Sequence, residues 1–327
     1  LITHDLGLAA ERATRVIVMQ HGHIVEQGPS REILTNPQHP YTKKLIAAAP
    51  SLAAQRSETR HHKSSDSGLT LLQVKGVTKR FLLPSSRPWK KEYFTAVNNV
   101  DLSIKQMHTT AIVGESGSGK STLAKMMLGL LDPTEGEVTY EGKPIRKMRR
   151  DAELNFRKRV QPVFQNPYGT LDPMWSVFNI IEEPLKVHHL GDKKTRARRV
   201  SEIIDRVALP QSMLRRYPME LSGGQQQRIA IARALVLEPE LIICDEAVSA
   251  LDVLVQAQIL ELLNELQRDL GLTYVFITHD LAVVKQIADD VVVMRNGAIV
   301  ERGETDELFA HPQQEYTQRL LLSLIHI

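Results

Sequence analysis

The sequence contains a single cysteine and no long apolar run. Cys244 alone excludes an internal disulfide and an all-cysteine metal site, and it is compatible with a reducing cytosol. No stretch reaches the ~18 consecutive apolar residues of a transmembrane helix, so none is predicted. The net charge of +3 over 327 residues gives no case for nucleic-acid binding. The hydrophobic content of 42% and charged content of 24% are typical of a soluble globular protein with a core.

A segment at the start of the chain repeats a segment near its C-terminal end. Residues 2–6 and 277–281 both read Ile-Thr-His-Asp-Leu, at an offset of 279 − 4 = 275 positions. The register continues without a gap to Tyr41-Thr42 and Tyr316-Thr317. Two generic strand-turn-helix segments rarely match by accident over such a length. We therefore predict a tandem protein, in which residues 1–50 are the tail of a truncated first domain and residues 71–321 form a complete second domain.

The segments outside these two domains carry little functional signal. Residues 51–70 are rich in Ser, Arg, His and Lys, which predicts a flexible linker. The His61-His62 pair within it lacks a Cys or carboxylate cluster, so a metal site there is disfavoured. Residues 322–327 resemble a translated library-adaptor sequence, and we interpret them as a non-native tail.

A glycine-rich segment follows a short apolar run. Ala111-Ile112-Val113 predicts a buried strand, and residues 122–127 predict a helix after the segment. The segment fits the pattern G-x-x-x-x-G-K-[ST] in the context that a phosphate-binding loop needs. Its backbone N–H groups and the helix N-terminus attract phosphate oxygens. The residues predicted to contact ATP here are Gly114, Glu115, Ser116, Gly117, Ser118, Gly119, Lys120, Ser121 and Thr122.

Two carboxylates follow a second apolar run. Residues 241–244 predict a strand buried on both faces, which delivers Asp245 and Glu246 at its carboxyl end. Ligands of open α/β sheets bind at that end, so both side chains are expected beside the phosphate loop. We expect Asp245 and Ser121 to hold Mg²⁺ and Glu246 to polarise the attacking water. A helix cap, the usual role of such a pair, is the minority interpretation here.

The order of the motifs resembles the nucleotide-binding subunits of ABC importers, and most of all the dipeptide/oligopeptide family in its fused two-cassette form. Segments 36–42, 164–173 and 311–317 resemble peptide-importer cassettes in particular. Ala247-Val248 departs from the Pro-Thr of many cassettes, and the cysteine-rich iron–sulfur tail of some is absent. The motifs after the phosphate loop are Gln165, the signature Leu221-Ser222-Gly223-Gly224-Gln225, Asp245-Glu246, the D-loop Ser249-Ala250-Leu251-Asp252 and His279.

The resemblance implies an α/β fold of the ABC-type P-loop NTPase class. Its parts are a RecA-like core, an antiparallel β subdomain and an α-helical subdomain, here at about residues 166–222. Phe81 matches the family position whose ring stacks on adenine. A strand-end core residue is the alternative role for Phe81.

The resemblance also implies how such a cassette works. Two cassettes close head to tail around ATP and Mg²⁺, and each signature segment completes the site of the opposite cassette. Glu246, His279 and Gln165 are the expected catalytic residues, and Gln165 joins Ser121 and Asp245 on Mg²⁺. Because the first domain is truncated, we expect the chain to bind ATP but to hydrolyse little of it alone.

The implied partners are a second cassette, two transmembrane permease subunits and a periplasmic or extracellular solute-binding protein, with no nucleic acid. The implied location is the cytoplasmic face of the inner or plasma membrane, as a peripheral subunit. The alternative function is a soluble ABC ATPase of translation or DNA repair, which usually carries long insertions or zinc and coiled-coil modules. Exporter and lipid-system cassettes are disfavoured by the peptide-importer segments.

Overall fold

A six-stranded sheet forms the centre of the molecule in the computed structural model, which describes residues 2–3, 9–10, 12–48, 68–83, 92–165 and 167–325. Residues 51–67 of the predicted linker at 51–70, with His61-His62, lie outside these residues. The strand order is β12-β11-β5-β10-β9-β8, and all neighbours are parallel except β12, which runs antiparallel to β11. The strands are β5 (Thr109–Val113), β8 (Val160–Phe164), β9 (Leu241–Asp245), β10 (Thr273–Ile277), β11 (Asp290–Arg295) and β12 (Ala298–Glu304).

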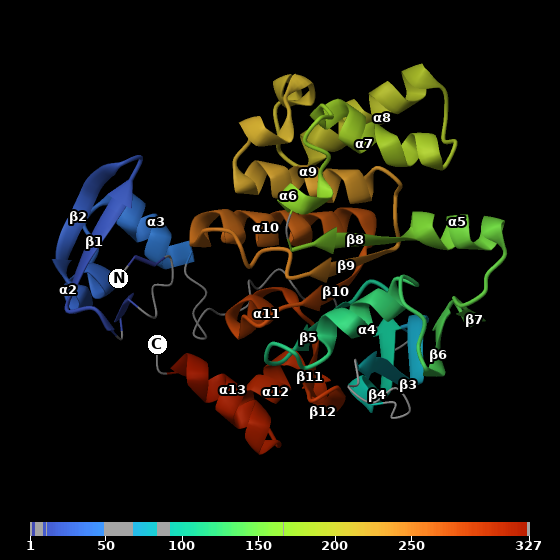
Figure 1. The fold of residues 1–327 in the computed structure, drawn as a ribbon. Coiled ribbons are helices and arrows are strands. Elements are labelled where there is room, and N and C mark those ends of the chain that lie inside the picture. The colour runs from blue at the N-terminus through green and yellow to red at the C-terminus, as the bar shows by residue number, and fades with distance from the viewer. Residues whose placement is uncertain are drawn as a thin grey trace.

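The central strands are apolar because both faces of the sheet are covered. Along β9, Ile242 and Cys244 face a core formed with helices, while Ile243 faces a second core. The first core includes α9 (Gly223–Leu235) and α10 (Val253–Leu270), which lie above the sheet in Figure 1, and α11 (Leu281–Ile287), which lies beside β10. The opposite face is covered by α4 (Lys120–Met127) and a smaller sheet.

The smaller sheet is antiparallel, in the order β4-β3-β6-β7 (Figure 1). Its strands are β3 (Thr70–Leu83), β4 (Glu92–Lys105), β6 (Glu135–Tyr140) and β7 (Lys143–Pro144). Helix α5 (Arg150–Arg159) then leads into β8 at the edge of the large sheet. Arg159 joins the two sheets, because its guanidinium donates to Glu240 before β9 and to Glu141 after β6.

Residues 167–220 are mostly helical and pack around α9 in the upper part of Figure 1. The elements are α6 (Pro167–Thr170), α7 (Val177–Val187), α8 (Lys193–Arg206) and the 3₁₀ turns η2 (Gln211–Arg215) and η3 (Pro218–Glu220). The sequence resemblance implied these three parts, and the architecture confirms the predicted fold class. No helix in the described ranges is both long and apolar enough to cross a membrane.

The two repeated segments fold alike. The first unit comprises β1 (Arg15–Gln20), β2 (His23–Pro29), α2 (Ser30–Thr35) and α3 (Pro40–Ala48). The second unit comprises β11, β12, α12 (Thr305–Ala310) and α13 (Glu315–Ile325). Both hairpins are antiparallel, and each has a bulge at the same place in the repeat, after Val18 and after Val293.

Shared hydrogen bonds extend the likeness to single residues. Glu26 accepts from the backbone N–H of Gln38 at 2.7 Å, and its counterpart Glu301 accepts from that of Gln313 at 2.7 Å. The first unit stands apart from the cassette core in Figure 1, with α3 against α10. The second unit is built into the core, because β11 pairs with β5.

Candidate nucleotide-binding site

The phosphate loop, residues 114–121, connects β5 to α4 as predicted. Two of its glycines are required by close backbone contacts. Gly114 has φ 147°, and a Cβ there would overlap the carbonyl oxygen of Met294. Gly119 has φ 103°, and a Cβ there would overlap the carbonyl oxygen of Ala96. The loop is therefore packed closely between β11 and β4.

Lys120 is buried in the first turn of α4, and its side chain folds back over the loop. Its Nζ donates to the carbonyl oxygens of Gly114 at 2.7 Å and Glu115 at 2.8 Å. Burial lowers the pKa of Lys120, while the negative charges of Glu246 and Asp245 oppose that shift. The ammonium group is thus kept at the loop by polar contacts that an anionic ligand can replace.

Asp245 lies beside Ser121, as the sequence predicted. The Ser121 hydroxyl donates to Oδ1 of Asp245 at 3.1 Å, although the two residues are 124 positions apart. Burial raises the pKa of Asp245, the Ser121 hydrogen bond opposes this rise, and the charge of Glu246 adds to it. The parallel pairing of β9, β10 and β5 creates this contact, because it brings the ends of these strands to one edge.

Glu246 and His279 come together at the same edge. Nδ1 of His279 lies 3.5 Å from Oε1 of Glu246. Glu246 has φ 51°, a left-handed conformation that is rare for a residue with a side chain and that concentrates at functional sites. Its backbone is held in place, since its N–H donates to the Ile277 carbonyl at 2.9 Å and its carbonyl accepts from the Ser249 hydroxyl at 3.0 Å.

Gln165 and the D-loop complete the group. Gln165 follows β8, and its Nε2 lies 3.4 Å from Oγ of Ser249. Ala250 is exposed, Leu251 is buried, and Asp252 accepts from the N–H of Val255 to cap α10. Gln165, Ser249, Glu246 and His279 are therefore linked through side-chain contacts along the carboxyl edge of the sheet.

The signature segment, residues 221–225, forms the start of α9. Leu221 is buried, and Ser222 and Gln225 make a reciprocal capping box, in which the Ser222 N–H donates to Oε1 of Gln225 at 3.0 Å. Gly224 must be small, because a Cβ there would overlap Val255 of α10. Gly223 has more room. The free end of this helix therefore presents N–H groups suited to an anion.

The remaining predicted residues lie at the surface of the loop and the small sheet. Glu115, Ser116 and Gly117 are exposed, Ser118 is buried, and Thr122 is half-buried in α4. Phe81 near the end of β3 is 39% exposed, which excludes the alternative of a core residue. Among the residues that the structure describes, no three His, Cys, Asp or Glu side chains form a metal-binding group.

Sequence reasoning missed one contact to the loop. The hydroxyl of Tyr316, in the first turn of α13, accepts a hydrogen bond from the N–H of Glu115 at 3.1 Å. Tyr316 stood out in the sequence only as part of the repeated Tyr-Thr pair. Nothing in the local pattern predicts that it reaches a loop 201 positions earlier.

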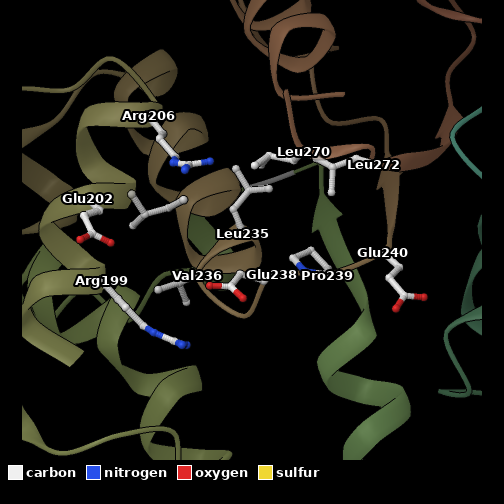
Figure 2. Close-up of a pocket in the computed structure, with 11 residues that line it drawn as sticks. Arg199, Glu202, Arg206, Leu235, Val236, Glu238, Pro239, Glu240, Leu270 and Leu272 are labelled. Atoms are coloured by element: carbon white, nitrogen blue, oxygen red, sulfur yellow. The ribbon is translucent and has the colours of Figure 1, made fainter. Parts of the chain in front are cut away.

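A surface pocket lies at the opposite end of the strands (Figure 2). Glu238 and Glu240 precede β9, and Leu270 and Leu272 precede β10, so the pocket is at the amino ends of these strands. Ligands of open α/β sheets bind at the carboxyl ends. The pocket is therefore separate from the residues gathered around the phosphate loop.

Two family models match the chain. The model described as "ABC transporter" matches residues 97–249. A solved structure described as a dimeric bacterial ABC transporter cassette, MJ0796, is 31% identical with a TM-score of 0.62, and the match covers 72% of this chain and 99% of that one. The chain belongs to the ABC transporter family of ATP-binding cassettes. The second model, described as "Oligopeptide/dipeptide transporter, C-terminal region", matches residues 25–75, which include most of the first unit.

Other relatives agree with this family. CbiO1 of Clostridium perfringens, described as part of the ABC transporter complex cbiONQ, is 30% identical with a TM-score of 0.64, over 79% of this chain and 97% of that one. The glutathione import ATP-binding protein GsiA of Escherichia coli K12 is 42% identical over 99% of this chain and 55% of that protein. GsiA of Pectobacterium atrosepticum is 40% identical over 98% and 55%. The chain thus spans about half the length of the curated relatives it matches.

Proposed function

We propose that this cassette hydrolyses ATP to energise the import of peptides or similar small solutes through partner permeases. The meeting of the phosphate loop, Asp245, Glu246 and His279 at one sheet edge carries the proposal. The names of the 42% identical relatives, glutathione import ATP-binding proteins, support an importer with a peptide-like solute. The second structure of MJ0796, described as a post-hydrolysis state bound to ADP and Pi, supports hydrolysis.

ATP fits the loop through its backbone and Lys120. The loop N–H groups and the start of α4 favour an anion, and Lys120 Nζ can exchange its two carbonyl acceptors for phosphate oxygens. Phe81 offers a half-exposed ring for adenine at the end of β3.

The donor set beside the loop fits Mg²⁺, which prefers oxygen ligands. The Ser121 hydroxyl and the Asp245 carboxylate are already within 3.1 Å of each other. Ser121, Asp245 and Gln165 would hold the ion together with phosphate oxygens, and the ion would neutralise charge on those oxygens. Ionised Asp245, which burial disfavours, would gain a compensating cation.

Glu246 is the proposed residue that polarises the attacking water. His279, 3.5 Å from it, would hold the γ-phosphate and keep this carboxylate oriented. Gln165 would report nucleotide binding to the helical subdomain through its position after β8. Catalysis then consists mostly of positioning and charge stabilisation.

The signature segment would act on the site of an opposite cassette, with the D-loop at the same interface. Its capping box keeps the start of α9 ordered while leaving the remaining N–H groups for a γ-phosphate. The structure of MJ0796, described as dimeric, supports the pairing of two cassettes.

The first unit supports the fused two-cassette form. Ile17 and Met19 on β1 are 56% and 57% exposed, whereas their counterparts Val292 and Met294 are 2% and 0% exposed. In the second unit these positions lie on the strand beside β5 and pack in one core cluster with residues of α4. The first unit therefore presents an apolar face that suits the strand and helix of another cassette core. In this proposal residues 1–50 end the first cassette and residues 71–321 form the second, joined by a linker, with a non-native tail at 322–327.

An exposed apolar patch on the helical subdomain suits the permeases. Met174 and Met219 are 81% and 84% exposed, and Trp175 and Tyr217 lie beside them. The hydrogen bond from Val177 N–H to the Arg216 carbonyl, at 2.9 Å, keeps the two segments adjacent. Isolated exposed apolar residues are ordinary, but four together indicate a contact surface. We propose two permease subunits here, a solute-binding protein on the other side of the membrane, and a peripheral location on the cytoplasmic face.

A transport measurement distinguishes the importer role from the alternative role as a soluble ABC ATPase. Two permease genes and a solute-binding-protein gene beside this gene, and ATP-dependent uptake of glutathione or a dipeptide by the reconstituted system, support the importer. A translation or DNA-repair phenotype without transport contradicts it.

The hydrolytic role is tested by Glu246→Gln in the longer two-cassette protein. We expect ATP affinity within about twofold of the parent, and hydrolysis reduced by at least ~100-fold, the lower range for losing a general base. Phosphate release and equilibrium binding measure the two effects. Parent-like turnover would remove Glu246 from catalysis, and Glu261→Gln on exposed α10 surface serves as the control.

A further inference from the structure

We propose that Tyr316 is a positioning residue that holds the phosphate loop and, through it, Lys120. The inference rests on the proposed ATP function. Its starting point is the hydrogen bond that the Tyr316 hydroxyl accepts from the N–H of Glu115 at 3.1 Å. This bond joins the C-terminal helix of the cassette to the loop that binds nucleotide.

The bond acts on a single peptide unit. The N–H of Glu115 and the C=O of Gly114 belong to the same planar peptide and point in opposite directions. Tyr316 binds the N–H, and Lys120 Nζ binds the C=O at 2.7 Å. The orientation of this peptide therefore sets one of the acceptors of the Lys120 ammonium group, beside the Glu115 carbonyl oxygen at 2.8 Å.

The peptide needs an external support because Gly114 precedes it. Gly114 has φ 147°, a region that residues with a Cβ seldom adopt, and a glycine allows many other orientations. The close approach of the Met294 carbonyl excludes a larger residue at this position. Close packing thus requires a glycine before this peptide, and the Tyr316 hydroxyl gives the peptide N–H a fixed partner.

Tyr316 is itself fixed by its surroundings. Its side chain is 8% exposed and packs in a cluster with Val113 and Leu281. The guanidinium of Arg295 lies 4.7 Å from the centre of its ring. Glu301 accepts from the N–H groups of Gln313 and Gln314, which orients the turn leading into α13. A buried ring that contacts Arg295 and begins an anchored helix can restrain the loop.

The repeat supplies a matched control. Tyr41 occupies the same place in the first unit, in the first turn of α3, since 41 + 275 = 316. In the described chain this unit has no phosphate loop of its own. A substitution at Tyr41 therefore changes the same local structure without touching nucleotide contacts of the complete cassette.

The test compares Tyr316→Phe with Tyr41→Phe in the 327-residue chain. Both keep the ring and remove one hydroxyl. We expect Tyr316→Phe to weaken binding of a fluorescent ATP analogue with Mg²⁺ by about threefold to tenfold, as one lost hydrogen bond allows. Tyr41→Phe is expected to bind like the parent. Hydrogen exchange of the loop peptide should rise in Tyr316→Phe alone, at a temperature well below unfolding of all three proteins.

Parent-like affinity and loop exchange in Tyr316→Phe would overturn the inference while leaving the proposed function intact. Equal losses of affinity in both variants would also overturn it, because they would reflect general destabilisation. A parent chain that binds no ATP analogue would overturn the proposed function and this inference together.

Discussion

At the scale of single residues, Asp245 combines a functional position with an unfavourable charge. Burial raises its pKa, and the neighbouring charge of Glu246 adds to the rise, while the Ser121 hydroxyl opposes it. The folded chain therefore holds the Asp245 proton more tightly than the unfolded chain. Consequently, ionised Asp245 reduces stability above its folded pKa, and this penalty disappears below the ordinary value of 3.8.

We predict that Asp245→Asn raises the thermal unfolding midpoint by a few degrees near pH 8, in the absence of nucleotide. The difference from the parent should shrink as the pH falls through the raised pKa toward the ordinary range. The same variant should weaken Mg²⁺-dependent nucleotide binding, because a neutral amide oxygen at this position removes the negative charge that would balance the ion. Exposed Asp269→Asn is the control. A midpoint difference that stays constant across pH would contradict the role given to the buried charge.

At the scale of elements, the phosphate loop depends on its glycines unequally. Gly119 and Gly117 both have positive φ, at 103° and 80°. A Cβ at Gly119 would overlap the Ala96 carbonyl of β4, whereas a Cβ at Gly117 would meet no atom within 4 Å. Backbone strain is therefore shared by both positions, and steric overlap is confined to Gly119.

We predict that Gly117→Ala destabilises the fold by about 1–2 kcal/mol, the cost of a side chain in a left-handed conformation. Gly119→Ala should cost roughly 3 kcal/mol or more, because β4 must also move. Urea unfolding of both variants measures the difference. Equal costs would show that the loop can move away from Ala96 freely.

The elements that the sequence predicted are those with local signals. The apolar runs at 111–113 and 241–244 became β5 and β9, and the helix after the loop became α4. The family resemblance implied an antiparallel β subdomain, but nothing in the sequence predicted the long β3–β4 pairing. Its register depends on pairs such as Phe81 with Phe94, which are distant in the sequence. The left-handed backbone of Glu246 and the contact of Tyr316 with Glu115 depend on packing between distant segments, so no local pattern indicates them.

At the scale of the whole molecule, the phosphate loop and the signature segment of this chain belong to two different ATP sites in our proposal. In the arrangement that we propose, the signature segment that faces this phosphate loop comes from an opposite cassette, and Ser222 at the start of α9 is exposed. Activity of the chain alone then requires two copies to pair head to tail. Pairing follows mass action, so the rate per chain should be low at high dilution and rise with protein concentration.

Mixing two inactive variants tests this pairing directly. Lys120→Ala removes the phosphate contact, and Ser222→Arg blocks the signature segment, so each variant should be inactive alone. In an equal mixture, about half of the randomly formed pairs contain one copy of each variant. Each such pair has one intact site of two. We therefore expect about one quarter of the parent activity under C₂ pairing. Phosphate release at high protein concentration measures this recovery. Full activity of the parent at the lowest concentration, or no recovery on mixing two variants that still self-associate, would contradict a signature segment that acts on the opposite chain.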